Sequence, residues 1–233
     1  MTDRPVVAVP RAQTDQPLRL GSGRSVTLVM FSGGIDSTHL LWHLLTETDD
    51  VVLAHHVHLI NAERRHPAEA RACKAIVTHL KDRHRDFFYT ESAVDRSRFK
   101  VFGTDVITVA AEGGIAASNF LADTGVMPQR WTLGINAEEA AEVSDHAVKR
   151  LPFVLAAMSA STWPNTPPRY FRPAIKPKAQ LIAEIGDDLA SLCWTCRRPV
   201  WADDGAWRAC GKCKTCTLMR EIDTGHSKQS ADA

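Results

Sequence analysis

The most informative stretch of this chain is Ser32-Gly33-Gly34-Ile35-Asp36-Ser37. It follows the apolar run 26–31 and precedes the largely apolar run 38–45, so the order is strand, tight turn and helix. Two glycines permit a turn with positive φ and a close approach of the backbone to a ligand. The first turn of the helix then offers N–H groups and a partial positive charge that suit a phosphate, and Ser32 and Ser37 add hydroxyl donors.

This motif differs from the commonest nucleotide loop, because no Lys follows the glycines. It resembles the pyrophosphate loop (PP-loop) of enzymes that hydrolyse ATP between the α and β phosphates and leave AMP on a substrate. In such a loop Asp36 would hold the metal or orient the pyrophosphate. We therefore expect ATP to bind at Ser32, Gly33, Gly34, Ile35, Asp36 and Ser37. The alternative is an ordinary Gly-Gly turn between a strand and a helix.

Composition indicates a globular chain. It has 233 residues, of which 44% are hydrophobic and 24% charged, with a net charge of +1. This length suits one α/β domain with a small appendage. The charge gives no argument for a nucleic-acid or membrane partner. No apolar run approaches the roughly 20 residues of a membrane span, and the N-terminus lacks a signal pattern. We expect a cytoplasmic protein, in which six Cys serve as metal ligands better than as disulfides.

Short apolar runs alternate with helical patterns along the chain. This order predicts a parallel sheet covered by helices on both faces, with ligands at the carboxyl ends of the strands. We expect strands at 26–31, 51–59, 86–90, 130–136 and 169–173, and helices at 67–80, 106–121, 137–158 (kinked at Pro152) and 178–189. The predicted divisions are a flexible arm (1–24), an ATP-binding domain (25–190), a four-cysteine lobe (191–222) and a disordered tail (223–233).

The cysteines near the end of the chain indicate a metal site. Cys210, Cys213 and Cys216 are each separated by two residues, and Cys193 and Cys196 lie upstream with the same spacing. Four thiolates around one ion form a closed, structural zinc site, so five candidates compete for four places. An iron–sulfur cluster and a redox dithiol are the alternatives.

Histidines form a second cluster in the predicted strand 51–59. His56 and His58 would share one face of that strand, and His55 the other. We expect packing positions there rather than a metal site.

The loop and the cysteine cluster together resemble the 7-cyano-7-deazaguanine synthase family over roughly residues 25–220. Arg65-His66-Pro67-Ala68-Glu69 resembles the Arg-His-x-x-Glu after the second strand of the family. Gly134 sits where the family has a glycine at the end of the fourth strand, and Asp145 resembles an Asp about ten residues further on. The run 178–182, Lys-Ala-Gln-Leu-Ile, resembles the start of the last large helix.

The resemblance also bears on the zinc ligands. Trp194-Thr195-Cys196 resembles a Trp-Ser-Cys that carries the first ligand in the family. It therefore implies Cys196, Cys210, Cys213 and Cys216 as the ligands of Zn²⁺, with Cys193 as the competitor for Cys196.

The resemblance implies a fold, a reaction and a set of site residues. The fold would be the adenine-nucleotide alpha-hydrolase-like α/β sandwich of PP-loop enzymes. Members convert 7-carboxy-7-deazaguanine to its nitrile with ATP, Mg²⁺ and ammonia, using adenylation to turn a poor leaving group into a good one. Catalysis would fall to Asp36, Ser37 and Lys178, and Gly134 would join the ATP loop. Substrate binding would fall to Arg65, His66, Glu69, Gly103, Asp105 and Asp145.

One departure from the family leaves the product open. Where the family has Pro-Gly-Arg-Asn, this chain has Phe102-Gly103-Thr104-Asp105 after Val101, so an acid replaces the Asn. Three products stay open, namely the nitrile, the amide and a protein adduct. The adduct is included because family relatives in antiviral gene clusters are thought to use an acceptor other than ammonia, such as an amine on a protein. A tRNA-thiolating PP-loop enzyme and a non-catalytic nucleotide-binding module are further alternatives. The family also suggests a homodimer.

Overall fold

A parallel sheet organises the chain. The computed structural model describes residues 23–101, 103–141, 145–164 and 166–229, with the backbone alone at 145–148 and 224–229. Within these residues five strands form a sheet in the order β3-β2-β1-β4-β5, and every pairing is parallel. The strands are β1 Val26–Met30, β2 Val51–Ile60, β3 Phe88–Asp95, β4 Arg130–Leu133 and β5 Arg169–Tyr170. The predicted α/β class is confirmed.

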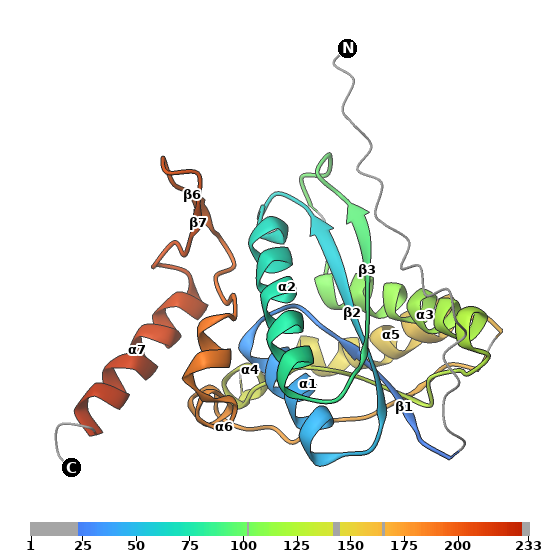
Figure 1. The fold of residues 1–233 in the computed structure, drawn as a ribbon. Coiled ribbons are helices and arrows are strands. Elements are labelled where there is room, and N and C mark those ends of the chain that lie inside the picture. Colours follow the sequence, from blue (N-terminus) through green and yellow to red (C-terminus); the bar gives the residue numbers. More distant parts are fainter. Residues whose placement is uncertain (1–22, 102, 142–144, 165, 230–233) are drawn as a thin grey trace.

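Helices cover both faces of the sheet (Figure 1). On one face lie α1 Ile35–Glu47, α2 His66–Arg83 and α6 Lys178–Ser191; on the other lie α3 Asp105–Thr124 and α5 Asp145–Ser161. Each layer contributes to its own hydrophobic cluster against the strands. All five residues of β1 are buried, as expected for a central strand between two helical layers.

For the segment after β4, the prediction was one helix over 137–158, kinked at Pro152. The structure has the helix α4 Ala137–Ala141 and then α5, which runs through Pro152 to Ser161, while residues 142–144 lie outside the described part of the chain. Pro152 lies between Leu151 and Phe153, both exposed at 45% and 64%. A proline removes one helical N–H donor, yet the helix continues through this position.

The cysteine-rich lobe follows α6 and lies to one side of the sheet (Figure 1). It contains an antiparallel hairpin, β6 Val200–Trp201 and β7 Trp207–Arg208, and the helix α7 Lys214–Gln229. The backbone is helical as far as Gln229, within the segment predicted as a tail. Residues 1–22 of the predicted arm lie outside the described part of the chain.

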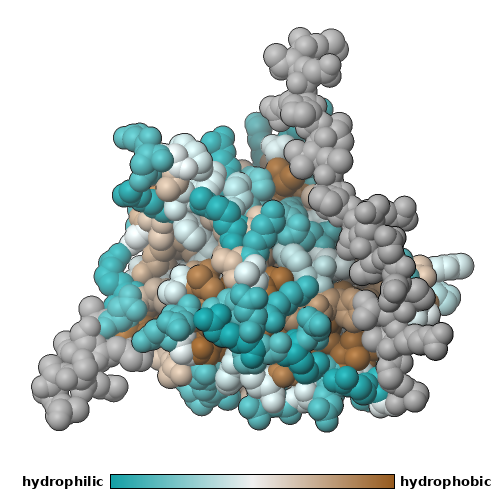
Figure 2. Space-filling model, in the orientation of Figure 1, coloured by the Kyte–Doolittle hydropathy of each residue, from teal (hydrophilic) through white to brown (hydrophobic). Residues whose placement is uncertain are grey.

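The face drawn in Figure 2 is mainly hydrophilic. Figure 2 shows teal residues spread over most of the face in view, with brown residues in small groups between them. Among the described helices, none combines the length and apolar character that a bilayer crossing needs.

Candidate functional site

The turn after β1 is shaped by its two glycines. Gly33 has φ +72°, and a Cβ added there would lie 2.9 Å from the Cys73 sulfur and 3.1 Å from its backbone nitrogen. A side chain at this position is therefore excluded by both conformation and space. Gly34 is the N-cap of α1 and makes no side-chain capping bond, so the positive end of the helix faces the turn without a capping side chain.

Serines hold the shape of this turn. The Ser37 hydroxyl accepts a bond from the Ser32 backbone N–H at 3.2 Å and donates to the Gly34 carbonyl oxygen at 3.2 Å. It also lies 3.1 Å from the Ser32 hydroxyl. Ser37 is buried, so its side chain braces the turn from the helix side.

Asp36 presents its carboxylate at the start of α1. Its Oδ2 accepts a bond from the Asn136 amide at 3.0 Å and lies 3.2 Å from the Lys178 ammonium. Its Oδ1 is buried and has no hydrogen-bond partner among the described residues. Lys178 and Asn136 are 3% and 0% exposed, so they fix the carboxylate firmly. One oxygen is thus anchored and the other remains for a ligand, and a buried carboxylate oxygen suits a divalent cation.

Gly134 explains why the chain after β4 can reach this carboxylate. A Cβ added at Gly134 would lie 2.5 Å from the Ser37 nitrogen and 2.6 Å from the Asp36 carbonyl carbon. The backbone after β4 therefore passes directly against the first turn of α1. Two residues later, Asn136 bonds to Asp36 through its amide nitrogen, and its Oδ1 accepts the Glu139 backbone N–H at 2.7 Å.

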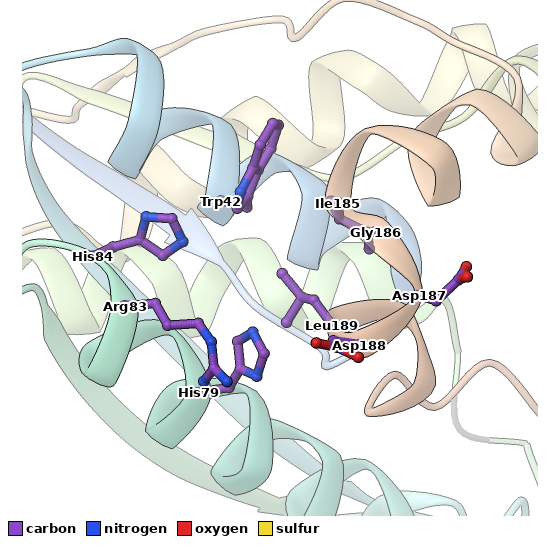
Figure 3. Close-up of a pocket in the computed structure, with 9 residues that line it drawn as sticks. All are labelled: Trp42, His79, Arg83, His84, Ile185, Gly186, Asp187, Asp188 and Leu189. Atoms are coloured by element: carbon purple, nitrogen blue, oxygen red, sulfur yellow. The ribbon is translucent and has the colours of Figure 1, made fainter.

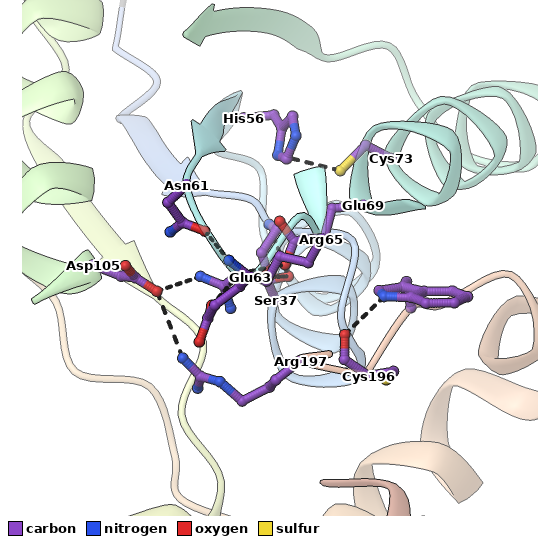
Figure 4. Close-up of polar contacts among 12 residues, drawn as sticks. Ser37, His56, Asn61, Glu63, Arg65, Glu69, Cys73, Asp105, Cys196 and Arg197 are labelled. Atoms are coloured by element: carbon purple, nitrogen blue, oxygen red, sulfur yellow. Dashed lines mark hydrogen bonds and ion pairs between the residues drawn. The ribbon is translucent and has the colours of Figure 1, made fainter. Parts of the chain in front are cut away.

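A second polar group surrounds Arg65, at the N-terminus of α2 (Figure 4). Its guanidinium bonds to Asp105 at the start of α3, and its Nε lies 3.1 Å from Glu63 Oε2 and 3.4 Å from Glu69 Oε1. Arg197 of the cysteine-rich lobe lies 3.6 Å from the same Asp105 oxygen. Burial raises the pKa of Glu69, although Arg65 opposes that shift.

The structure therefore brings together Arg65, Glu69 and Asp105 of the predicted substrate residues. Gly103 has φ +77° and precedes α3 closely. His66 is not among the ion pairs of this group, and burial lowers its pKa. The side chain of Asp145 lies outside the described residues.

Four cysteines of the lobe converge as a candidate metal centre. The sulfur atoms of Cys196, Cys210, Cys213 and Cys216 all lie within 4.8 Å of one another. The sulfurs of Cys213 and Cys216 are 3.5 Å apart, close to the spacing of about 3.8 Å that thiolates take around a tetrahedral zinc ion. Backbone N–H groups of Cys210 and Cys213 donate to the sulfurs of Cys196 and Cys210, which favours thiolates.

Cys193 takes no part in this group. Its sulfur donates to the Leu189 carbonyl oxygen at 3.5 Å, and its side chain packs against the core under α1 and α6. Burial raises the pKa of Cys193 to about 11. The geometry therefore separates the two upstream cysteines, with Cys196 among the clustered thiols and Cys193 in the core.

The β2 histidines form hydrogen bonds within the sheet. His55 bonds to Thr90 at 2.8 Å and to Ser92 at 3.1 Å. His56 bonds to the Phe31 carbonyl oxygen at 2.9 Å, and its ring lies 4.6 Å from that of His58. Burial lowers the pKa of His55 and of His56 to about 4. Among the described residues, these side chains belong to no cluster with the geometry of a metal site.

A separate pocket of about 320 Å³ opens between α1, α2 and α6 (Figure 3). Its lining comes from later turns of α1 and α2 and from the break in α6 at Gly186, so it is distinct from the turn after β1. The lining residues are Trp42, His79, Arg83, His84, Ile185, Gly186, Asp187, Asp188 and Leu189.

Asn136, Glu63 and Arg197 were missed by sequence reasoning. Asn136 ends the predicted fourth strand, two residues after a glycine already placed at the loop, and that position was a usable signal. Glu63 and Arg197 lie in connecting segments, and no spacing in the sequence indicates that both meet the Arg65 group.

In sequence, neither a family model nor a curated protein matches this chain. The U34-tRNA thiolase NcsA from Methanococcus maripaludis, with its [4Fe-4S] cluster, is similar in structure with a TM-score of 0.50 and 11% identity. The match covers 90% of this chain and 66% of that one. A 4-thiouridine synthetase in complex with RNA and ATP matches with a TM-score of 0.46 and 16% identity, over 86% of this chain and 50% of that one. The chain thus spans less than two thirds of the thiolase, with which it shares an α/β fold.

Proposed function

We propose that this chain is an ATP-dependent enzyme that cleaves ATP between the α and β phosphates and transfers AMP to a substrate. The observation that carries the proposal is the Asp36 carboxylate. Asn136 and Lys178 hold one of its oxygens. The other is buried beside the N-terminus of α1, and none of the described residues forms a hydrogen bond with it. A simple structural turn needs no such half-satisfied acid, whereas a metal–phosphate site does.

The roles of the individual residues follow from their positions. The turn from Ser32 to Ser37 would hold the pyrophosphate with backbone N–H groups, because Gly33 and Gly34 keep side chains away. Mg²⁺, when bound, would neutralise phosphate charge and orient the phosphates. Asp36 would hold that ion through its unpartnered oxygen, and Lys178 would restrain Asp36 and stabilise charge as the pyrophosphate leaves.

For the substrate, we propose the carboxylate of 7-carboxy-7-deazaguanine, which would proceed to the amide or nitrile with ammonia. The support is the family resemblance together with the gathering of Arg65, Glu69 and Asp105 at the N-termini of α2 and α3. Arg65 would face the anionic substrate. Three carboxylates and two guanidinium groups meet there, so a cationic amine on a protein fits as an alternative acceptor.

A second candidate is thiolation of tRNA. It is favoured by the fold shared with a U34-tRNA thiolase and by the four clustered thiols. The close grouping of these sulfurs fits a single ion better than a four-iron cluster, whose irons hold their thiolates further apart. We therefore propose Zn²⁺ in this centre.

The experiment supplies ATP labelled at the α-phosphorus, Mg²⁺ and one acceptor system at a time. The systems are 7-carboxy-7-deazaguanine with ammonia, the same acid with an amine-bearing peptide, and unmodified tRNA with sulfide. We expect AMP and pyrophosphate with the first system, and mass spectrometry would then separate amide, nitrile and peptide adduct. Labelled ADP in every system would overturn the proposal, and thiolated tRNA as the sole product would select the second candidate.

A further inference from the structure

The segment from Trp194 to Arg197 joins the cysteine centre to the turn after β1. The Trp194 backbone N–H donates to the Gly33 carbonyl oxygen at 2.8 Å. The indole N–H of the same residue donates to the Cys196 carbonyl oxygen at 2.9 Å. The residue that touches the turn is thus tied to a cysteine of the centre two positions away.

Arg197 makes a second connection, from the centre to the Arg65 group. The backbone N–H of Arg197 forms a hydrogen bond to the Cys213 sulfur. The Arg197 backbone therefore points at the centre. Its side chain reaches the other way, to the Asp105 oxygen that also binds Arg65 (Figure 4).

This arrangement makes Asp105 a carboxylate between two guanidinium groups. Arg65 is the deeper partner, with a side chain 12% exposed, while that of Arg197 is 51% exposed. Arg65 also faces Glu63 and Glu69, so it has other anions toward which it can turn. The position of the Arg65 guanidinium hence depends on how firmly Asp105 is held from the side of the cysteine centre.

We propose that metal in the cysteine centre orders both sides of the site through the segment Trp194–Arg197. Trp194 carries this order to the Gly33 turn. Arg197 acts as a positioning residue that holds Asp105 and, through it, Arg65. This inference goes beyond the proposed function, because it concerns the folded chain and its metal and does not depend on which substrate is used.

The test is hydrogen–deuterium exchange of the full chain, with Zn²⁺ bound, after chelation and after Zn²⁺ is restored. Chelation should speed exchange in peptides covering 32–37, 63–70 and 103–108, leave the buried strands β1 and β2 protected, and reverse on addition of Zn²⁺. Rapid exchange confined to the lobe itself would overturn the proposal. A uniform rise in every peptide would also overturn it, since the metal would then support the whole fold.

A pair of variants isolates the Arg197 arm. Arg197→Ala keeps the backbone N–H and should keep the metal, yet raise exchange at 63–70 and 103–108 about two- to fivefold, as expected for a partly exposed ion pair. Exchange at 32–37 should stay unchanged, because Trp194 is intact. Arg198→Ala, its exposed neighbour, is the matched control and should leave all three peptides unchanged. Equal effects of the two variants, or loss of metal from Arg197→Ala, would show that Arg197 has no positioning role.

Discussion

Gly134→Ala should impair ATP use more than it impairs folding. The new Cβ would lie 2.5 Å from the Ser37 nitrogen and 2.6 Å from the Asp36 carbonyl carbon, whereas ordinary contacts begin near 3.4 Å. The backbone after β4 and the first turn of α1 must therefore separate by about 1 Å. Overpacking of this kind costs about 1–3 kcal/mol of stability, and a displacement of about 1 Å at a reacting group can reduce the rate about 100-fold.

Gly114→Ala is the matched control. Its Cβ would lie 2.5 Å from the Met158 carbonyl oxygen, so the clash is equally severe but separates α3 from α5, away from the turn. Urea unfolding should give similar losses of stability for both variants. Initial rates of pyrophosphate release, normalised to folded protein, should fall about 100-fold in kcat/KM for ATP with Gly134→Ala and little with Gly114→Ala. Equal rates in the two variants would refute the reasoning.

Three further predictions follow from the site. Asp36→Asn removes the negative charge of the carboxylate whose Oδ1 is unpartnered, and it should lower the rate of pyrophosphate release about 100-fold or more. A wild-type rate in this variant would exclude a role of Asp36 in metal binding. Elemental analysis should find about one zinc per chain, which Cys193→Ser retains and Cys196→Ser loses. The reverse pattern would show that Cys193, and not Cys196, is the zinc ligand. In an NMR titration, His55 and His56 should stay neutral down to about pH 4. Because the unfolded chain binds these protons near pH 6.5, stability should fall as the pH drops from 6.5 toward 4, and ordinary titration near 6.5 would contradict their burial.

The sequence was sufficient for the layers and for the principal loop. Strand, turn and helix around Ser32–Ser37 follow from local apolar periodicity and glycine chemistry, and both act within a few residues. The alternation of such units then predicts a parallel sheet. Gly134 was placed at the loop by resemblance, and the structure supplies the reason, a backbone crossing that has no room for a Cβ.

Contacts between segments far apart in the chain were harder to predict. Asn136 contacts Asp36, although 100 positions separate them in the chain. Lys178, the second residue that contacts Asp36, comes from another element, α6. The meeting of Arg197 with Asp105 depends on where the cysteine lobe packs, which no local pattern contains.

The most direct test of the proposed activity follows an oxygen atom. 7-Carboxy-7-deazaguanine labelled with ¹⁸O in its carboxylate would be incubated with the full chain, ATP, Mg²⁺ and ammonia, and the nucleotide product analysed by mass. If the carboxylate attacks the α-phosphorus at the Ser32–Ser37 turn, one ¹⁸O becomes part of the acyl adenylate bridge. Ammonia then attacks the activated carbon, the C–O bond breaks, and AMP leaves with that ¹⁸O. We predict AMP that carries one ¹⁸O atom. Unlabelled AMP, or ADP with the label in phosphate, would contradict adenylation of the carboxylate.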